Sequence, residues 1–317
     1  MFEKTRAAEQ LRDEIEVALN LLNEHSHLFN LVREPLSQPG RGLSTGDLPN
    51  FPLALLPLLV CEAVCGEYTR ALPAAAALQF MLAAGDVFDD VEDADSADSL
   101  PGKYGVPLAT SIATTLLILA EKELVRLQEK GVDEAITIRI FDIVNSCYLA
   151  ACIGQHLDLI HKANPNISED EYLKTISLKS ASQLECACEV GAILGNAGTE
   201  LVDLFRQFGH NLGIAAQIRN DMQKILKKEN WGPEPCLPFI FALQTTGVGM
   251  KNRIRSVLIK SHITEPEWAD IRNWLDEKGA LHYSAIKMES YRQRALKALD
   301  LCQKHGAEIE KLKRYLS

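Results

Sequence analysis

The stretch AAAALQFMLAAGDVFDDVED, residues 74–93, joins an apolar run to regularly spaced carboxylates. These carboxylates recur at i, i+3, i+4 and i+7 as Asp86, Asp89, Asp90 and Asp93. A helix would carry all four on one face, where like charges on adjacent turns repel. Hard oxygen ligands at this spacing favour Mg²⁺, which completes its shell with water and substrate phosphates. We therefore predict a metal-dependent site for a phosphorylated small molecule, with a solvated acidic helix end as the alternative.

The remainder of the chain repeats this helical periodicity. Apolar residues return every three or four positions, and alternating runs long enough to form strands are absent from the sequence. Short polar breaks rich in glycine or proline separate the segments, and none resembles a long interdomain linker. Ser168, followed by three acidic residues, predicts a helix N-terminus. We predict an all-α fold, a single large helical bundle over residues 1–317 with a central active-site cavity.

Composition narrows the function classes. A net charge of −10, with no basic patch among aromatic residues, argues against a nucleic-acid partner. Eight cysteines without a Cys-x-x-Cys pair predict reduced thiols in a cytoplasmic protein. Residues 1–22 show no secretory signal, and the apolar runs 51–60 and 109–120 are shorter than the ~20 residues that a membrane span needs. We expect no membrane anchor.

A second polar stripe occurs later in the chain, after the apolar residues 212–216. It has the same i, i+3, i+4, i+7 spacing and consists of Gln217, Asn220, Asp221 and Lys224. In a helical bundle, sites form between facing helices from side chains that project inward. We predict that this stripe belongs to the same site as the aspartates. The alternative is an amphipathic helix whose polar face meets water.

Five motifs follow one another along the chain: Glu62-Ala63-Val64, residues 71–78, Asp89-Asp90-Val91-Glu92-Asp93, Leu178-Lys179-Ser180 and residues 213–217. Together they resemble the trans-isoprenyl diphosphate synthase family, also called the polyprenyl synthetase family, over residues 44–245. The resemblance implies an all-α, Mg²⁺-dependent prenyltransferase of the isoprenoid synthase type. Its substrate would be an allylic prenyl diphosphate, bound between two metal-binding helices.

The stripe and the resemblance together assign roles to individual residues. The expected metal ligands are Asp86, Asp89, Asp90, Asp93 and Asp221. By family position, Lys179 would contact the diphosphate, and Gln217 would lie near the carbocation or the leaving group. The further substrate-binding candidates are Gln155, Asn220, Lys224, Phe88 and Gly85. Cleavage of the allylic C–O bond develops negative charge on the leaving group, which metal ions and ammonium groups stabilise.

Two departures from the family pattern concern a second diphosphate pocket, which chain elongation needs for isopentenyl diphosphate. The family's G-G-K-x-x-R-P is replaced by residues 44–49 (STGDLP), and its R-R-G by residues 99–102 (SLPG). Arg41 is the only cation near the first of these places. Without the arginines a dianionic diphosphate loses its bidentate partners, so we predict an acceptor other than isopentenyl diphosphate.

The second motif departs as well, because Asp221 is its only carboxylate and Lys224 stands where the last aspartate would be. Lys224 either contacts the diphosphate or pairs with an aspartate and leaves fewer metal ions in the site. One branch of the family resembles the chain in these features: the ComQ-type prenyltransferases, which modify a tryptophan of a small peptide. Residues 86–95 and Gly154-Gln155-His156-x-Asp158 carry the resemblance. It implies a peptide or aromatic acceptor.

Two other functions stay open. A class I terpene cyclase would also lack the isopentenyl pocket, although Lys224 and Lys228 occupy positions where its motif has Ser and Glu. A non-catalytic regulatory subunit of a heteromeric synthase is the third possibility, which the retained carboxylates argue against. Small residues at Ala84 and Gly85 favour prenyl chains of fifteen to twenty carbons. Family habit implies a homodimer.

Overall fold

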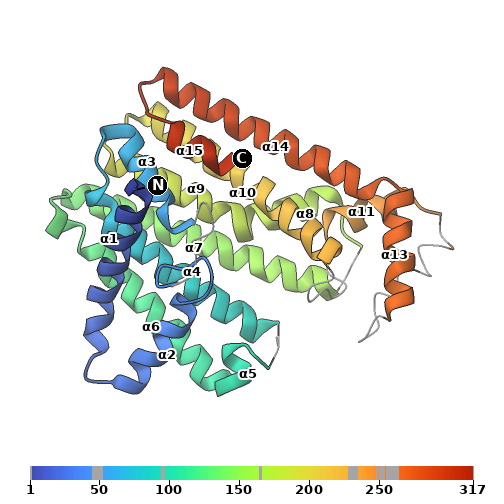
Figure 1. Ribbon diagram of the computed structural model, residues 1–317, viewed down its shortest axis with the longest axis horizontal. Helices are drawn as coiled ribbons and strands as arrows, with labels where there is room; N and C mark the ends of the chain where they lie inside the picture. Colours follow the sequence, from blue (N-terminus) through green and yellow to red (C-terminus); the bar gives the residue numbers. More distant parts are fainter. Residues whose placement is uncertain are drawn as a thin grey trace. The chain divides into compact units, whose positions relative to one another are not determined.

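The computed structural model describes residues 2–44, 53–93, 97–163, 166–227, 235–247, 249, 254 and 264–316 (Figure 1). Every regular element within these ranges is a helix, which confirms the predicted all-α class. The described residues form two compact units. Unit 1 comprises Met1–Cys147, Leu184–Gln207 and Ala298–Ser317, and unit 2 comprises Tyr148–Gln183 and Phe208–Lys297. The expectation of one domain over residues 1–317 stays a prediction.

Most helices lie wholly within one of the two units. Unit 1 holds α1 (Phe2–Leu19), η1 (Asn20–Leu22), α2 (Ser26–Leu36), η2 (Leu53–Leu55), α3 (Leu56–Cys65), η3 (Thr69–Ala71), α4 (Leu72–Glu92), α5 (Leu100–Tyr104), α6 (Val106–Val125), η4 (Gln128–Lys130), α15 (Glu310–Lys313) and η6 (Arg314–Leu316). Unit 2 holds α8 (Glu169–Ile176), the π-helix η5 (Ser177–Ala181), α11 (Leu237–Gln244) and α13 (Glu265–Glu277). Both units receive residues from α7 (Glu134–Ala163), α9 (Ser182–Leu194), α10 (Thr199–Lys227) and α14 (Ala280–Lys304).

Helix α4 forms the centre of unit 1. Pro73 in its first turn needs no N–H partner, and the alanines that follow have high helix propensity. The side chains of Ala74–Ala77 are fully buried, because small residues allow neighbouring helices to approach closely. α4 packs against α6, α1 and α2 (Figure 1). This packing holds the whole helix, including its acidic end, in one orientation within unit 1.

The Glu62-Ala63 motif at the end of α3 receives the last residues of the chain. The backbone N–H of Glu308 donates to the carbonyl of Ala63 at 2.8 Å, and Lys311 pairs with Glu62 at 2.8 Å. Ile309 and Leu312 are fully buried beside these polar contacts. The motif therefore has a structural partner within unit 1.

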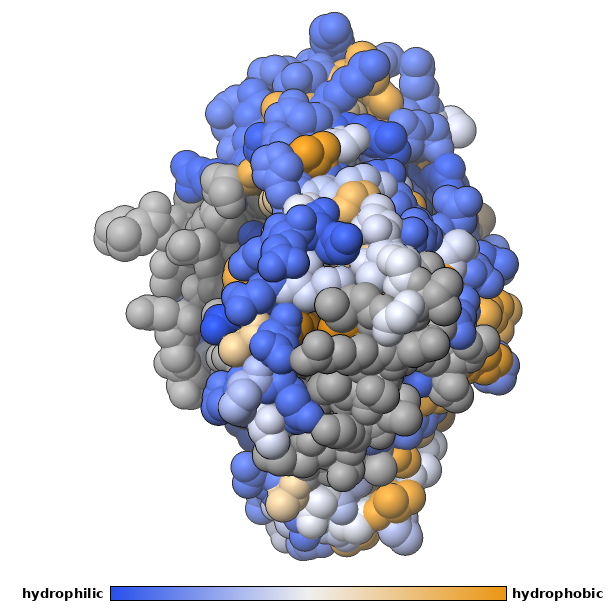
Figure 2. All heavy atoms as spheres, turned by 90° about the vertical axis from the view of Figure 1, so that its right-hand side faces the viewer, coloured by the Kyte–Doolittle hydropathy of each residue, from blue (hydrophilic) through white to orange (hydrophobic). Residues whose placement is uncertain are grey.

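Unit 2 begins its second helix as the sequence predicts. Ser168 caps α8 with a reciprocal capping box, in which its side chain accepts from the N–H of Glu171 and Glu171 accepts from the N–H of Ser168. Two apolar clusters, one under α8 and one under α13, form the core of the unit. Figure 2 shows mostly hydrophilic residues on the described part of the face that it presents.

Two segments of the described chain are long and apolar enough to cross a membrane by length and composition alone. They are Thr69–Glu92, whose most apolar window is 72% buried, and Glu134–Lys162, whose window is 17% buried. The first contains α4, whose burial explains its composition as that of a core helix. The second is α7, which keeps apolar side chains exposed at Ile138, Leu149, Ile153 and Ile160. The absence of a membrane anchor stays a prediction.

A buried ionic cluster ties α1 to the end of α6. Glu123 is 1% exposed and accepts two hydrogen bonds from Arg126, which also pairs with Glu14 on α1 at 3.0 Å. Burial raises the pKa of Glu123 to about 7, because the desolvation of its charged form outweighs the stabilisation by Arg126. Folding therefore favours the protonated form of this carboxyl group.

This raised pKa predicts a pH-dependent stability. The contribution of Glu123 to the unfolding free energy is complete below pH 4.5 and is lost as the pH rises through about 7. The pKa difference corresponds to about 3 kcal/mol. Urea denaturation of Glu123→Gln at pH 4.5 and pH 7.5 should show that wild type loses up to about 3 kcal/mol relative to this variant. Glu129→Gln, at an exposed partner of Arg126, is the control. A pH-independent difference would contradict the prediction.

Candidate functional site

The predicted aspartate stripe lies at the C-terminal end of α4. The helix runs to Glu92, and Asp93 is its C-cap residue, whose N–H donates to the carbonyl of Asp89 at 2.8 Å. Asp89, Asp90 and Asp93 are half-buried. The C-terminus of a helix carries partial negative charge, so carboxylates there are destabilised unless cations neutralise them. The local structure of α4 thus makes positive charge near these carboxylates favourable.

Asp86 stands one turn earlier on the same face and already has a cationic partner. Arg41 donates from Nε to Oδ2 of Asp86 at 2.9 Å, and a second guanidinium nitrogen contacts the same oxygen. Although half of the Asp86 side chain is exposed, desolvation by the surrounding protein raises the pKa of its carboxyl group, and Arg41 opposes this effect. An arginine therefore supplies the counter-charge of Asp86.

No group of three or more His, Cys, Asp or Glu side chains in the described ranges is arranged to hold a metal ion. The donor chemistry nevertheless fits Mg²⁺, since Asp89, Asp90 and Asp93 offer carboxylate oxygens on one helical face. The assignment of these residues, and of Asp86 and Asp221, as metal ligands stays a prediction. Two neighbouring substrate candidates also lie on α4, with Gly85 exposed and Phe88 half-buried.

In unit 2 the lysine of the Leu-Lys-Ser motif lies in a π-helix between two helical partners. Lys179 belongs to η5, and a Cβ added at Gly154 of α7 would lie against its backbone N and 2.6 Å from its Cα. On α10, a Cβ added at Gly213 would lie 2.5 Å from the Cα of Ala181. Only glycine allows both approaches, and π-helical turns often occur at functional sites. The backbone of Lys179 is therefore fixed by close packing.

The ammonium group of Lys179 is also held in place. Its Nζ donates to Oδ2 of Asp158 at 2.9 Å, and Lys162 lies 3.7 Å from the same oxygen. Asp158 belongs to the sequence motif Gly154-Gln155-His156-x-Asp158, one turn after Gln155. The Gln155 amide is buried, and neither of its polar atoms has a partner among the described residues. An unpaired buried amide is costly, so Gln155 is a candidate to hydrogen-bond a bound molecule or water.

The second stripe takes part in a chain of hydrogen bonds that sequence analysis missed. Ser180 Oγ donates to Gln217 Oε1 at 2.9 Å, and Gln217 Nε2 donates to Asp221 Oδ1 at 2.8 Å. Tyr172 donates from its hydroxyl to the other oxygen of Asp221 at 2.6 Å. Burial, followed by the negative charge of Asp221, raises the pKa of Tyr172 well above its usual value. Asn220 and Lys224 are exposed on the same helix.

This arrangement gives Gln217 a defined orientation. Since Asp221 accepts from Gln217 Nε2, the amide oxygen of Gln217 is turned towards the Ser180 hydroxyl. Asp221 is only 9% exposed and receives a donor at each carboxylate oxygen. Sequence analysis had no local signal for Tyr172, because its partner Asp221 lies 49 residues further along the chain.

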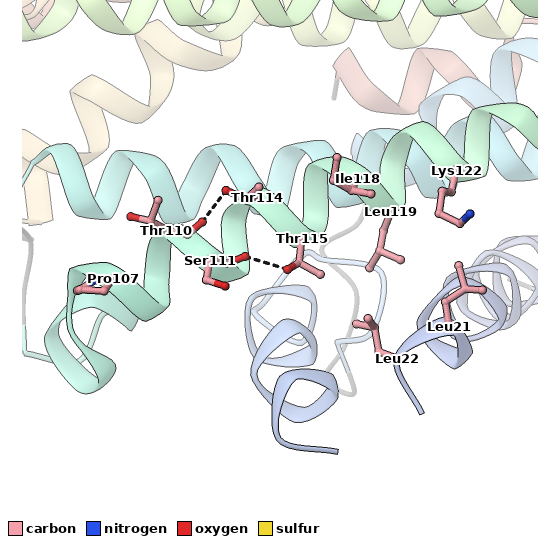
Figure 3. Close-up of a pocket in the computed structure, with 10 residues that line it drawn as sticks. All are labelled: Leu21, Leu22, Pro107, Thr110, Ser111, Thr114, Thr115, Ile118, Leu119 and Lys122. Carbon is pink, nitrogen blue, oxygen red and sulfur yellow. Dashed lines mark hydrogen bonds between the residues drawn. The ribbon is translucent and has the colours of Figure 1, made fainter. Parts of the chain in front are cut away.

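A groove of about 550 Å³ opens elsewhere in unit 1, and no predicted site residue lines it (Figure 3). Leu21 and Leu22 of η1 face a row of side chains on α6 that includes Ile118 and Leu119. The hydroxyls of Thr114 and Thr115 donate to helix carbonyls one turn back. The groove is therefore mainly apolar.

The all-helical fold has an aspartate-bearing core helix in unit 1 and a closely packed lysine in unit 2. Comparison with known proteins gives the family. The family model described as Polyprenyl synthetase matches residues 54–232, more than half of the chain. The chain belongs to the polyprenyl synthetase family. Membership confirms the family resemblance found in the sequence and supports the prediction that the chain is a prenyltransferase.

Among the relatives, the geranylgeranyl diphosphate synthase of Mycobacterium tuberculosis is 27% identical over 205 residues, which cover 60% of this chain and 57% of the relative. The geranylgeranyl diphosphate synthase of Sulfolobus acidocaldarius is 34% identical over 161 residues, covering 50% and 48%. The chain thus matches about half the length of these relatives.

A solved structure gives the fold. The geranylgeranyl pyrophosphate synthase from Corynebacterium glutamicum, complexed with isoprenyl diphosphate and magnesium, has a TM-score of 0.80 at 19% identity, covering 98% of this chain and 96% of that one. This likeness confirms the isoprenoid synthase type of fold that the resemblance implied.

The buried carboxylate Asp221 predicts a stability effect. Tyr172→Phe keeps the aromatic ring but removes one of the two hydrogen-bond donors to Asp221. The buried carboxylate of Asp221 is then left with fewer hydrogen bonds. We expect the unfolding free energy at pH 7 to fall by about 1–3 kcal/mol in urea denaturation. Tyr283→Phe, which removes a hydrogen bond to the less buried Glu169, is the matched control and should cost less. Equal losses in the two variants would contradict this reading of Asp221.

The close approach of Gly154 to Lys179 gives a second prediction for this site. Gly154→Ala should lower the unfolding free energy by about 1–3 kcal/mol, although alanine favours helix, because the methyl group displaces the π-helix backbone. Gly198→Ala is the control, since a Cβ there meets nothing within 4 Å. Thermal denaturation compares the two variants with wild type. A Gly154→Ala protein as stable as wild type would show that the helices can separate freely.

Proposed function

We propose that this protein is a Mg²⁺-dependent prenyltransferase that ionises an allylic prenyl diphosphate and transfers the prenyl group to an acceptor other than isopentenyl diphosphate. The observation that carries the proposal is the acidic end of α4, where Asp89, Asp90 and Asp93 share one face at a helix C-terminus in a polyprenyl synthetase. Such an end needs cations, and a diphosphate needs them too.

Unit 2 has side chains of its own that suit a diphosphate or a carbocation. Lys179 would donate to the diphosphate as the negative charge of the diphosphate grows, and the hydrogen bond to Asp158 directs the ammonium group until the substrate binds. Mg²⁺, when bound, would neutralise the leaving diphosphate. Gln217, oriented by Asp221, would present its amide to the carbocation or the leaving group. The magnesium and isoprenyl diphosphate in the Corynebacterium glutamicum structure support this substrate class.

Two places determine whether a second diphosphate can bind: residues 44–49 and 99–102, where the family has the basic residues for isopentenyl diphosphate. Arg41, next to the first place, pairs with Asp86. Lys103, just after the second, pairs with Glu34 at 2.6 Å. Both cations therefore already have carboxylate partners within unit 1, which disfavours a second diphosphate. We propose a peptide or aromatic acceptor, as in the ComQ-like branch, and a prenyl chain of fifteen to twenty carbons.

A homodimer is part of the proposal. Helix α6 keeps Val106, Leu108, Ile118 and Val125 between 43% and 55% exposed, and α7 exposes a similar apolar set. Apolar surface of this kind marks protein interfaces. The cytoplasmic location stays a prediction.

Asp89→Asn provides the test of the metal assignment. The asparagine keeps the size of the side chain but removes its charge, so diphosphate release should fall roughly 100-fold or more. Purified protein with Mg²⁺ is incubated with ten-, fifteen- or twenty-carbon allylic diphosphates, and pyrophosphate release is followed with and without candidate tryptophan peptides. Asp98→Asn, at an exposed aspartate away from the stripe, serves as the control. Unchanged turnover in Asp89→Asn would refute the assignment.

The products separate the competing functions. Prenylated acceptor supports the proposal, whereas longer diphosphates formed with isopentenyl diphosphate would establish ordinary elongation, as the names of the relatives suggest. Hydrocarbons or terpene alcohols from the allylic substrate alone would establish a cyclase. Failure to bind any allylic diphosphate would favour a regulatory subunit.

A further inference from the structure

The loop before residue 45 holds Arg41 in a fixed position in unit 1. Its N–H donates to Gln38, and the N–H of Ser44 donates back to the carbonyl of Arg41 at 3.1 Å. Arg12 of α1 donates to the carbonyl of Ser44 at 2.8 Å. At Gly42, a Cβ would collide with the side chain of Ile15, so the loop lies tightly against α1. The arginine is thus presented from a backbone with little freedom.

The guanidinium of Arg41 contacts one carboxylate oxygen of Asp86. Both Nε and Nη2 contact Oδ2 of Asp86, and the arginine side chain is 20% exposed. Asp86 is half exposed and belongs to the last two turns of α4. The same guanidinium donors could bind the oxygens of a phosphate.

We infer that Asp86 is a specificity-determining residue, an internal carboxylate that occupies Arg41 and so denies it to the diphosphate of a second substrate. The inference rests on the proposed function and deepens it, because it assigns the exclusion of diphosphate-bearing acceptors to one side chain. Asp86 then acts through Arg41 in place of the metal-binding role that the sequence predicts for it, and Asp89, Asp90 and Asp93 stay the predicted metal ligands.

The electrostatics of the pair support this assignment. Arg41 lies in the loop and Asp86 lies on α4, 45 residues further along the chain. The contact therefore depends on the packing of these two segments against each other. A free Arg41 would be a pre-organised phosphate ligand, since its backbone is already fixed and guanidinium groups favour phosphate oxygens. An entering dianion would have to displace Asp86 and then lie beside its uncompensated charge. Asp86 therefore disfavours the anion twice, by competition and by repulsion.

The test measures anion binding without the metal. Inorganic pyrophosphate is titrated into wild type, Asp86→Asn, Asp86→Ala and Arg41→Gln/Asp86→Asn by calorimetry in the presence of EDTA, which removes metal-dependent binding. Both single variants should bind pyrophosphate at least tenfold more tightly than wild type, and the double variant should return to the wild-type affinity. Glu92→Gln removes an equal charge from the exposed side of the same helix and should change the affinity less than twofold.

Two results would overturn the inference. An unchanged affinity in both Asp86 variants would show that the carboxylate does not block Arg41. A gain that persists in the double variant, or that Glu92→Gln reproduces, would show a general charge effect. Circular dichroism and thermal denaturation confirm that each variant is folded. The proposed function fails separately, since elongation of an allylic diphosphate by the wild-type protein would refute it whatever the pyrophosphate titrations show.

Discussion

The structure of unit 1 depends on a helix that is apolar for most of its length and acidic at its end. Burial of the alanine-rich part of α4 fixes the helix among α1, α2 and α6. The same packing holds its carboxylates at a helix C-terminus, where the helix dipole is unfavourable for them. The apolar half thus provides the free energy that keeps a charged and otherwise unfavourable half in place.

The four aspartates at the end of α4 differ in the counter-charge that each has or is predicted to bind. Asp86 pairs with an arginine from a tightly packed loop, while Asp89, Asp90 and Asp93 are predicted metal ligands on the same helical face. A protein cation and a metal ion are alternative counter-charges with different consequences, because an arginine that is already paired cannot bind a substrate phosphate equally well. Neighbouring carboxylates on α4 therefore have different predicted roles: Asp86 binds an arginine, and Asp89, Asp90 and Asp93 are predicted to bind metal ions.

In unit 2, hydrogen bonds and close packing stabilise charged side chains. Asp221 is a buried carboxylate, which Tyr172 and Gln217 stabilise with one donor each. Lys179 is positioned by Asp158 and by a π-helix that lies against Gly154. In both cases a charged group that would be costly to bury has a polar partner on another helix. These partners fix the orientation of Lys179 and Asp221.

The sequence by itself determined the all-α class, the N-cap of α8, the aspartate face of α4 and the family, because periodicity, capping and motif order are local properties of the chain. It also identified Lys179, Gln217 and Asp221 as candidates. Only the tertiary structure decided their partners: Arg41 for Asp86, Asp158 for Lys179 and Tyr172 for Asp221. These contacts join residues 45, 21 and 49 positions apart. Such pairs form only when packing brings separate segments together, so no local pattern in the sequence encodes them.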